Sequence, residues 1–408
     1  MTTWQCSSFN RLTQSCYNNN MSTLLRTGLA VVIFGSMLVQ TTKSLRVAIL
    51  GSGIAGSSAA RTLADRGAKV TVFEAGFGIG GRTSTRITRD KPRYQFDHGA
   101  QYIGSPKTES FRESLESWKS DGFVKEWSGT FATAVGTNVE SESDKKERWV
   151  GFPRMNSICS NLLHHKNIRV KLQTRADASQ NDNKEWNVKH GKTKEDLGTF
   201  DWLIASDRNS GARHRTDLSD ANVQEFTTGL RGIQSVKSLT AMVVFEKSLD
   251  LKLDGIQFTG KDAQYGSLGW VARDTSKPGR ERKDGQECWV LQSHPDAAKK
   301  LLKGKYKVGE IREMAKDVLI GDFLNSLPQL GRTNKEVPSI VTSVGHRWGA
   351  AFPIPSQEYI DMDCQVIPPE HFVACGDYFG KLSGRIEGAY LSGRSAANEI
   401  IQLNEEIF

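Results

Sequence analysis

The segment LRVAILGSGIAGSSAARTLADRGAKVTVFEAG, residues 45–76, constrains the fold of this chain more than any other. An apolar, partly β-branched run ends at Gly51, a helical pattern of apolar residues follows, and a second apolar run leads to Glu74. Continuous apolar runs of this kind are typical of buried strands in parallel sheets. A strand, a glycine turn, a helix and a second strand in this order predict a β-α-β unit that binds a dinucleotide.

Each glycine of the turn has its own physical use in such a unit. Gly51 permits a tight turn, Gly53 lets the backbone approach a pyrophosphate, and Gly56 lets the helix pack closely on the sheet. The helix N-terminus offers free N–H groups to phosphates, and Glu74 can accept the hydroxyl hydrogens of an adenosine ribose. A bare G-x-G-x-x-G also occurs in ordinary turns, but the flanking strand, helix and acid favour dinucleotide binding. Which dinucleotide is bound stays open at this point.

Composition and charge exclude several classes of function. The 408 residues give room for about two domains. Half of the net charge of +8 comes from Arg11, Arg26, Lys43 and Arg46, so the remaining excess is too small to predict nucleic-acid binding. The six cysteines include no C-x-x-C pair, and the eight histidines show no metal-ligand spacing. We therefore expect neither a disulfide framework nor a bound metal ion.

Residues 1–44 differ in composition from the rest of the chain. They contain no Asp or Glu and include the apolar run GLAVVIFGSMLV, residues 28–39. This run is short for a membrane span but suits the apolar core of a signal peptide, and the Ser-rich stretch before it is typical of a transit peptide. We expect a leader that directs the protein to a plastid or to the secretory and endomembrane system, with residues 28–39 as a candidate membrane tether. No A-x-A site follows, so an uncleaved anchor is one alternative and an apolar tail without a role is another.

Apolar periodicity places further elements along the chain. Helical spacing predicts helices over Phe111–Gly122 and Val308–Leu327, and a last helix in residues 384–403. Three short runs separated by polar turns predict an antiparallel meander; they are Ile168–Thr174, Glu185–His190 and Phe200–Ser206.

Strand-like runs such as LTAMVVFE and ECWVLQSH indicate a second domain that begins at Ser238. Strand-like patterns return in Ser339–Pro353 and His371–Gly380. Nucleotide-binding patterns therefore stand at both ends of the chain, with other material inserted between them.

Several motifs, taken together, resemble the FAD-dependent amine-oxidase superfamily, and most closely its renalase-like branch. The resemblance covers nearly all of residues 45–403 and rests on these motifs in chain order: GSGIAG, FEAG, GIGGR, FDHGAQYI, RWVGFPRMNSI, FDWLIAS, SKPGR, HRW, ACGDYF and RIEGAYLSG. The GIGGR loop after the acid is typical of FAD proteins with the glutathione-reductase-like fold. DHGAQY, SKPGR, HRW and EGAYLSG favour the renalase-like branch.

The resemblance implies an α/β fold. It consists of a discontinuous, glutathione-reductase-like FAD-binding domain of the Rossmann type and an inserted α+β substrate domain. The FAD-binding domain is expected to comprise residues 45–110, 148–237 and 338–408, and the substrate domain residues 111–147 and 238–337.

The resemblance also implies, position by position, which residues hold a non-covalent FAD. Arg82 neutralises the pyrophosphate, Gln101 approaches the flavin, and Asp377 binds the ribityl chain. Residues 387–389 open the last helix under the flavin ring, where the positive end of the helix dipole stabilises a reduced anionic flavin. The full expected set is Gly51, Gly53, Ile54, Ala55, Gly56, Glu74, Ala75, Gly80, Gly81, Arg82, Gly99, Ala100, Gln101, Tyr102, Ala176, Gly376, Asp377, Glu387, Gly388 and Ala389.

The chain departs from the family pattern at two places, and both concern the substrate pocket. The strand FDWLIAS runs into the polar loop DRNSGARHRTD, where a small or Pro-containing turn is usual. Bacterial relatives tend to have a histidine where this chain has Gln292, and here His294 is displaced. Cys375 lacks the surrounding pattern used for covalent flavin attachment, so we expect non-covalent FAD.

A few further residues have both a functional and a structural interpretation. His346 and Trp348 are candidates for the substrate pocket at the flavin face, and a packed strand end is the alternative. Trp270 and Trp289 are expected to fill the core of the substrate domain. Lys277 is expected to be a turn residue, because Pro and Gly follow it.

We therefore expect a small-molecule oxidoreductase in which FAD accepts a hydride from an amine or from a dihydronicotinamide-type substrate. Dioxygen, giving hydrogen peroxide, or another acceptor then reoxidises the cofactor. No general base stands out, which favours the dihydronicotinamide type because an amine needs deprotonation first. Two alternatives remain: a flavin-binding protein with little turnover, and a membrane-surface tetrapyrrole or isoprenoid oxidase.

Overall fold

The structure is a computed structural model. It describes residues 44–89, 91–143, 146–207, 210, 216–218, 222–259, 265–334 and 336–408, which belong to one unit of the chain, Lys43–Phe408. All of the expected leader except Ser44 lies outside these residues, and so does most of the polar loop after Ser206. Over the part described, no helix has the length and apolarity that crossing a membrane requires.

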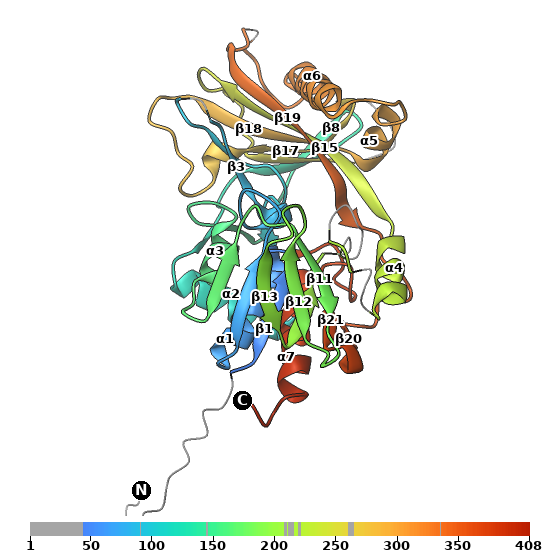
Figure 1. Ribbon diagram of the computed structural model, residues 1–408. Helices are drawn as coiled ribbons and strands as arrows, with labels where there is room; N and C mark the ends of the chain where they lie inside the picture. Colours follow the sequence, from blue (N-terminus) through green and yellow to red (C-terminus); the bar gives the residue numbers. More distant parts are fainter. Residues whose placement is uncertain are drawn as a thin grey trace, which may run out of the picture. The chain divides into compact units, whose positions relative to one another are not determined.

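A six-stranded sheet forms the base of the molecule (Figure 1). All neighbouring strands are parallel except the last pair, which is antiparallel. In spatial order the strands are β10 (Ile168–Lys171), β2 (Lys69–Phe73), β1 (Arg46–Leu50), β14 (Trp202–Ala205), β21 (Phe372–Ala374) and β20 (Gln365–Ile367). The chain thus builds this sheet from segments more than 300 residues apart, as a split domain requires.

Both faces of this sheet are covered, which explains why its strands are apolar throughout. Val47 and Ile49 pack in one core with the helices α1 (Ile54–Asp65), α3 (Ser157–Leu163) and α7 (Ile386–Gln402). Ala48 and Leu50 point the other way, into a second core under a three-stranded antiparallel sheet. That sheet consists of β11 (Ala176–Gln180), β12 (Trp186–His190) and β13 (Asp196–Phe200). The base therefore has three layers.

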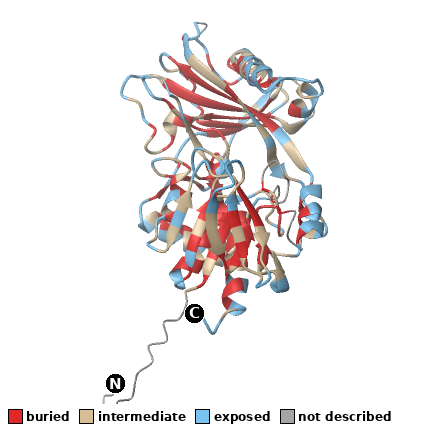
Figure 2. Cartoon of the chain, viewed as in Figure 1, coloured by how far each residue is buried: buried red, intermediate tan, exposed pale blue. Residues whose placement is uncertain are grey.

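A seven-stranded sheet forms the inserted part, and it is antiparallel except between β16 and β7. Its order is β19 (Ile340–Pro353), β15 (Ser235–Phe245), β18 (Glu287–Ser293), β17 (Leu268–Arg273), β16 (Gly255–Thr259), β7 (Phe131–Val135) and β8 (Asn138–Ser141). The helices α5 (Pro295–Leu301) and α6 (Val308–Ser326) cover one face, where Trp289, Leu291 and Phe323 share a core. Figure 2 shows buried residues running along the central strands of this sheet and of the base.

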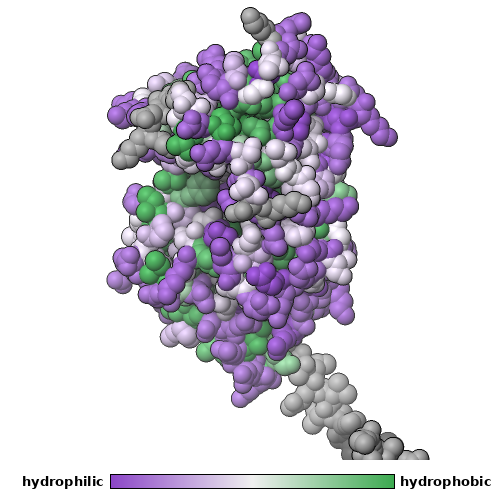
Figure 3. All heavy atoms as spheres, turned by 180° about the vertical axis from the view of Figure 1, so that it is seen from behind, coloured by the Kyte–Doolittle hydropathy of each residue, from purple (hydrophilic) through white to green (hydrophobic). Residues whose placement is uncertain are grey.

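Short elements connect the two sheets. The hairpin β3 (Thr85–Ile87) and β4 (Gln95–Asp97) packs Tyr94 and Phe96 against Met242 and Val290 on the free face of the seven-stranded sheet. A small sheet of β5 (Ile103–Gly104), β9 (Arg148–Gly151) and β6 (Val124–Glu126) lies next in the chain to α2 (Glu109–Ser120). The helix α4 (Gln224–Gly232) precedes β15. Seen from behind, the surface is mostly hydrophilic, with hydrophobic residues gathered in a recess (Figure 3).

The structure corrects two predictions about the organisation of the chain. The three runs at 168–174, 185–190 and 200–206 do contain strands, but they do not form one meander. The strands β10 and β14 join the parallel sheet, and the real meander includes β11 and β13, whose polar sequences gave little apolar signal. The expected boundary at residue 338 is also wrong, because β19 pairs with β15 of the inserted sheet. Apolar content finds a strand but does not identify its partner.

The expected segment 111–147 is likewise divided between the two parts. In α2, Phe111, Leu115 and Trp118 pack in the core of the base, whereas β7 and β8 extend the inserted sheet. The last helix and α6 lie where helical spacing predicts them.

The contact between α1 and α7 leads to a first prediction. A Cβ added at Gly393 would lie 2.1 Å from the carbonyl oxygen of Ala55, whereas one added at Gly321 in α6 would meet nothing within 4 Å. We expect Gly393→Ala to lower the free energy of unfolding by about 1–3 kcal/mol through overpacking. Gly321→Ala, the matched control, should raise it by about 0.5–1 kcal/mol. Urea denaturation measures both, and equal effects of the two changes would contradict this account of the helix crossing.

Candidate functional site

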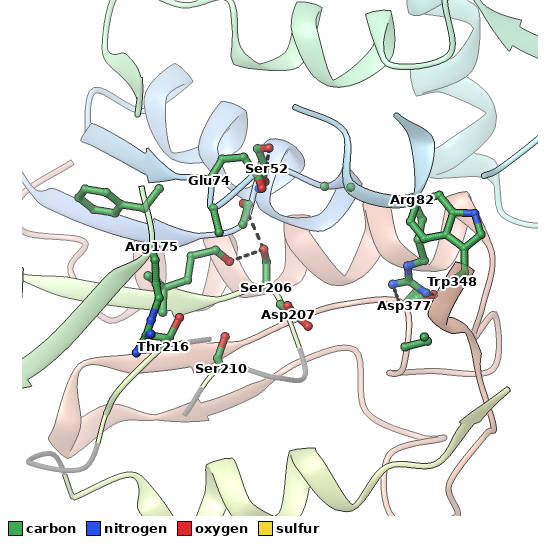
Figure 4. Close-up of a pocket in the computed structure, with 18 of the residues that line it drawn as sticks. Ser52, Glu74, Arg82, Arg175, Ser206, Asp207, Ser210, Thr216, Trp348 and Asp377 are labelled. Atoms are coloured by element: carbon green, nitrogen blue, oxygen red, sulfur yellow. Dashed lines mark hydrogen bonds and ion pairs between the residues drawn. The ribbon is translucent and has the colours of Figure 1, made fainter. Parts of the chain in front are cut away.

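Three adjoining cavities lie at the carboxyl ends of the parallel strands and below the inserted sheet. The nucleotide cavity, about 600 Å³, is lined by residues of the glycine turn and by Glu74, Ser206 and Asp377, which follow β2, β14 and β21 (Figure 4). The central cavity, about 130 Å³, shares Gly53, Arg82 and Asp377 with it. The outer cavity, about 430 Å³, shares the wall at Gly99, Ala100 and Gln292 with the central one. Ligands of doubly wound folds bind at this edge of the sheet.

Nearly all of the residues expected to bind the cofactor line these cavities. Around the nucleotide cavity lie Gly51, Gly53, Glu74, Ala75, Gly81, Arg82, Ala176, Asp377 and the pocket candidates His346 and Trp348. Around the central cavity lie Gly53, Ile54, Ala55, Gly80, Arg82, Gly99, Ala100, Trp348, Gly376, Asp377 and Ala389. Around the outer cavity lie Gly99, Ala100, Gln101, Tyr102 and Glu387. The fold therefore brings together residues from both ends of the chain.

Two expected residues have other surroundings. A Cβ on Gly56 would lie 2.1 Å from the Gly51 carbonyl oxygen, so Gly56 serves the close packing of helix on turn, as expected of the third glycine. Gly388 faces away from the three cavities, and a Cβ there would lie 2.3 Å from the carbonyl oxygen of Leu382. The expectation that Gly388 lies against the flavin ring is therefore wrong; it packs against the preceding turn. Ile386 and Ala389 face the central cavity instead.

The glycine turn has the geometry that its sequence predicts. Gly51 has φ of +101°, which only glycine adopts readily, and the Ser206 hydroxyl donates to the Leu50 carbonyl oxygen at 2.7 Å, which fixes the end of β14 to the turn. An added Cβ at Gly53 would meet nothing within 4 Å, so the cavity reaches the backbone there. The Glu74 carboxylate accepts from the Ser52 N–H and hydroxyl at 3.1 and 2.6 Å, and from the Gly76 N–H at 2.6 Å. These bonds hold the carboxylate at the cavity wall.

Arg82 and Asp377 form a bidentate ion pair at the border of the nucleotide and central cavities (Figure 4). Nη1 and Nη2 of Arg82 donate to the two carboxylate oxygens of Asp377 at 2.6 Å each. Burial alone would lower the pKa of Arg82, but the Asp377 carboxylate outweighs it and raises that pKa. Two residues expected to contact different parts of one cofactor thus meet each other across its expected path.

A fully buried ion network lies beneath the loop 97–101. Lys277 Nζ is 2.8 Å from Asp274 Oδ1 and 3.5 Å from Asp97 Oδ2, and it donates to Gln101 Oε1 at 3.2 Å. Arg280 pairs with the same Asp97 carboxylate. Lys277 begins a turn as expected, because its carbonyl oxygen accepts from the Arg280 N–H at 3.1 Å across Pro278 and Gly279. The sequence did not indicate its further role: the Lys277 side chain is 0% exposed and reaches into the core.

Electrostatics in this network differ between its two carboxyl groups. Burial would raise the pKa of Asp97, but the Lys277 and Arg280 cations and a hydrogen bond from Thr85 lower it below its ordinary value. Burial raises the pKa of Asp274, which Lys277 offsets only in part. Gln101 in turn donates to the backbone oxygens of Asp97 and Gly99. The network therefore holds the loop that forms the wall between the central and outer cavities.

One row of residues crosses the free face of the inserted sheet above these cavities. The register pairs Gln257 with Trp270, Trp270 with Gln292, Gln292 with Thr240, and Thr240 with His346. Directly paired residues point to the same face of a sheet. Gln292 donates to the Gly99 carbonyl oxygen at 2.7 Å, so this row contacts the loop below.

The row corrects one expectation and agrees with another. Trp270 is buried but lines the outer cavity, so it is more than core of the substrate domain. Trp289 is fully buried against Phe323, as expected of a core residue.

His98, His346 and Trp348 form an aromatic cluster behind the central cavity, with ring centroids 4.6–5.0 Å apart. Burial, with smaller contributions from His346 and Arg86, lowers the pKa of His98 to about 3. Burial, with Arg86 and Arg312, lowers the pKa of His346 to about 4. Both imidazoles are therefore neutral near pH 7, and Trp348 Nε1 donates to the His98 carbonyl oxygen at 3.0 Å.

Some lining residues escaped the sequence analysis. Gln292 was noted only as a departure from the family pattern, Ser206 only as the residue before the polar loop, and Ser238 only as the start of the second domain. Ser52, Phe352 and Arg385 were not singled out at all. Ser206 ends a strand of the parallel sheet, and that position is itself a signal, because strand ends meet at the site. Phe352 and Ser238 carry no such signal, since only the pairing of β19 with β15 brings them close.

Comparisons with known proteins agree with this description of the fold. Residues 49–117 match the family model of the NAD(P)-binding Rossmann-like domain. Among solved structures, the chain is similar to a protein described as a protoporphyrinogen oxidase from an Exiguobacterium species, with a TM-score of 0.62, 12% identity, and coverage of 88% of this chain and 99% of that chain. It is also similar to cyclohexylamine oxidase from Brevibacterium oxydans, with a TM-score of 0.59, 14% identity, and coverage of 89% and 100%.

These similarities confirm the predicted fold class, a Rossmann-type α/β fold with an inserted domain. The similarity to these two structures concerns the fold, and the resemblance to the amine-oxidase superfamily and to its renalase-like branch stays a prediction. Among the residues that the structure describes, no group of three or more His, Cys, Asp or Glu is placed to hold a metal ion.

The buried ion network leads to a second prediction. Lys277→Met leaves the carboxylates of Asp97 and Asp274 under-compensated, so we expect the free energy of unfolding to fall by about 3–5 kcal/mol. Because Asp274→Asn removes the group that Lys277 neutralises, the double variant should lose clearly less than the sum of the single losses. Guanidinium denaturation of the four proteins measures the coupling. Additive losses would show that Lys277 does not act through this pair.

The lowered pKa of His98 leads to a third prediction. An unfolded histidine has a pKa of about 6.5, so between pH of about 3 and 6.5 the unfolded chain binds more protons than the folded one. The free energy of unfolding should therefore fall as the pH falls through this window. His98→Phe should reduce the slope by up to about 1.4 kcal/mol per pH unit. Denaturation curves at several pH values test this, and an unchanged slope would refute a neutral buried His98.

Proposed function

We propose that this protein is an FAD-dependent oxidoreductase. The observation that carries the proposal is the convergence of the glycine turn, Glu74, Arg82, Asp377 and the start of α7 on adjoining cavities, although these segments lie at opposite ends of the chain. The Rossmann-type fold, shared with two proteins described as oxidases, supports it.

The chemistry of the lining residues fits FAD at this place. The open space at Gly53 admits a pyrophosphate against the backbone and the N-terminus of α1, and Glu74 lies at the wall as an acceptor for ribose hydroxyls. Arg82 would turn from Asp377 to the pyrophosphate, which leaves the Asp377 carboxylate for the ribityl hydroxyls. Cys375 packs in the core of the base, which supports non-covalent binding.

FAD supplies the hydride-accepting chemistry, and dioxygen or another acceptor would reoxidise it with release of hydrogen peroxide in the first case. The outer cavity is then the place for the substrate, because it adjoins the central cavity across Gly99 and Ala100. Trp270 and Gln292, which belong to the row described above, and Tyr102 would orient a flat molecule in this cavity. The proposed substrate classes are an amine and a dihydronicotinamide-type compound, as the renalase-like motifs imply.

The one carboxylate that the structure describes at the outer cavity is engaged in other hydrogen bonds, which favours a dihydronicotinamide-type substrate over an amine. Glu387 is the one carboxylate among the described lining residues, and its oxygens accept from the Lys107 N–H and from Thr108. A cationic amine has to lose a proton before hydride transfer, whereas a dihydronicotinamide does not. Anaerobic bleaching of the flavin by either class would separate an oxidoreductase from a flavin-binding protein with little turnover.

The fit of the cofactor leads to a fourth prediction. An added Cβ at Gly53 meets nothing within 4 Å, so we expect Gly53→Val to fold normally, to fill the open space at the turn and to bind FAD at least tenfold more weakly. Gly78→Val is the matched control, since an added Cβ there also meets nothing within 4 Å and Gly78 lines none of the three cavities. Flavin content and melting temperature are measured on the same samples. Full flavin loading of Gly53→Val would overturn the placement of the pyrophosphate.

A further inference from the structure

The outer cavity has a cation at its mouth that no carboxylate neutralises. Arg385 precedes α7 and lines both the central and the outer cavity. Its Nη2 atom lies 3.7 Å from the place of a Cβ on Gly104, which also lines the outer cavity. Within the described part of the chain, Arg385 makes no ion pair and its guanidinium donates no hydrogen bond. Its side chain is exposed, so a ligand in the cavity can reach it.

The nearest acidic residue in sequence is engaged elsewhere. Glu387 lines the same cavity, but it is 2% exposed and its carboxylate lies on the N-terminus of α2. There it accepts from the N–H groups of Lys107 and Thr108 at 2.8–3.0 Å and from the Thr108 hydroxyl at 2.9 Å. The Glu387 side chain thus caps another helix, and the expectation that Glu387 helps to open α7 under the flavin ring stays a prediction. The charge of Arg385 is therefore uncompensated in the cavity.

The outer cavity is also lined by hydrogen-bond acceptors. Gln257 uses its amide nitrogen on the Gly269 carbonyl oxygen at 2.7 Å, and Gln292 uses its own on Gly99 at 2.7 Å. These bonds leave the two amide oxygens, Oε1 of Gln257 and of Gln292, without a hydrogen-bond donor among the described residues. Trp270 lies between these two residues in the row, and its ring centroid is 5.6 Å from that of Tyr102. The cavity thus combines an aromatic wall, two acceptors and one cation.

We propose that Arg385 selects a substrate with an anionic group, a carboxylate or a phosphate, attached to a flat ring that carries an N–H donor. The ring lies against Trp270 and Tyr102, the donor meets the oxygens of Gln257 and Gln292, and the anion remains at the mouth with Arg385. Because a guanidinium binds carboxylates and phosphates through two parallel hydrogen bonds, it fixes the direction in which the ring enters. This proposal rests on the proposed function, since it takes the outer cavity as the substrate site.

The charge of the cavity distinguishes between the two substrate classes. A simple ammonium ion would meet Arg385 without a carboxylate to hold it, so like charges would oppose its binding. A substrate that combines a ring with a carboxylate or phosphate meets the opposite charge. The proposal therefore ranks anionic ring compounds above plain amines.

The test measures ligand binding to the flavin-loaded protein, with no turnover needed. Benzoate, benzamide and benzylamine share one ring and differ in charge, and each is titrated while the flavin absorbance is recorded. We expect benzoate to bind the unchanged protein most tightly and benzylamine most weakly. Arg385→Gln should weaken benzoate about tenfold, which is the loss of one charge-assisted hydrogen-bond pair at an exposed site. It should leave benzamide within twofold.

Two control variants define the interpretation. Arg394→Gln removes a partly exposed arginine further along α7 that lines none of the three cavities, and benzoate binding should not change. Arg385→Lys keeps the charge and should retain most of the affinity for benzoate. Higher salt should weaken benzoate in the unchanged protein and in Arg394→Gln, and have little effect in Arg385→Gln.

The outcomes separate this proposal from the one on which it rests. If the unchanged protein binds no flavin, the proposed function fails. If it binds flavin but benzoate and benzamide bind equally, or if Arg385→Gln and Arg394→Gln weaken benzoate alike, the anion selection by Arg385 is wrong and the flavin assignment stands. Equal flavin content in all variants shows that the change at Arg385 acts on the ligand and not on the cofactor.

Discussion

The buried carboxylate of Asp97 holds the two parts of the molecule together. It accepts a hydrogen bond from Thr85 in the neighbouring strand and one from the backbone of Met155 in the base, and it pairs with Lys277 and Arg280 from the inserted part. A charge taken out of water is tolerated only when its partners have good geometry and its remaining lone pairs are satisfied. This requirement fixes the position of the loop 97–101, and with it the wall shared by the central and outer cavities.

Sequence reasoning identified most of this molecule where function and local pattern coincide. The glycine turn and Glu74 were recognisable because each occupies a fixed place beside a strand or helix, whereas Arg82 and Asp377 were assigned through the family resemblance. The structure brings all of them to adjoining cavities. The turn at Lys277 was predicted because its sequence neighbours specify one. The burial of its side chain was missed, because that depends on Asp97, which lies 180 residues away in the chain. Gly388 was misplaced because a helix pattern gives the residues of the first turn but not the direction in which each one faces.

Strand pairing was the other limit. The strands β10, β12 and β14 are similar in length, yet two of them join the parallel sheet and one joins the meander. Register and partner depend on contacts between distant segments, and a single sequence carries no information on these. The row from Gln257 to His346 could not be predicted for the same reason. Its members come from five strands, and only the register of the sheet pairs them.

That row has a consequence for how proteins of this architecture diversify. Along each of its strands, successive residues alternate between the cavity side and the core under α5 and α6, so that Gln292 faces the ligand side while the adjacent Leu291 packs in the core. Substitutions in the row change the shape and polarity of the binding surface and leave the packing on the opposite face intact. Selection for a new substrate can therefore act on a handful of positions, scattered along the gene, at little risk to the fold that carries them.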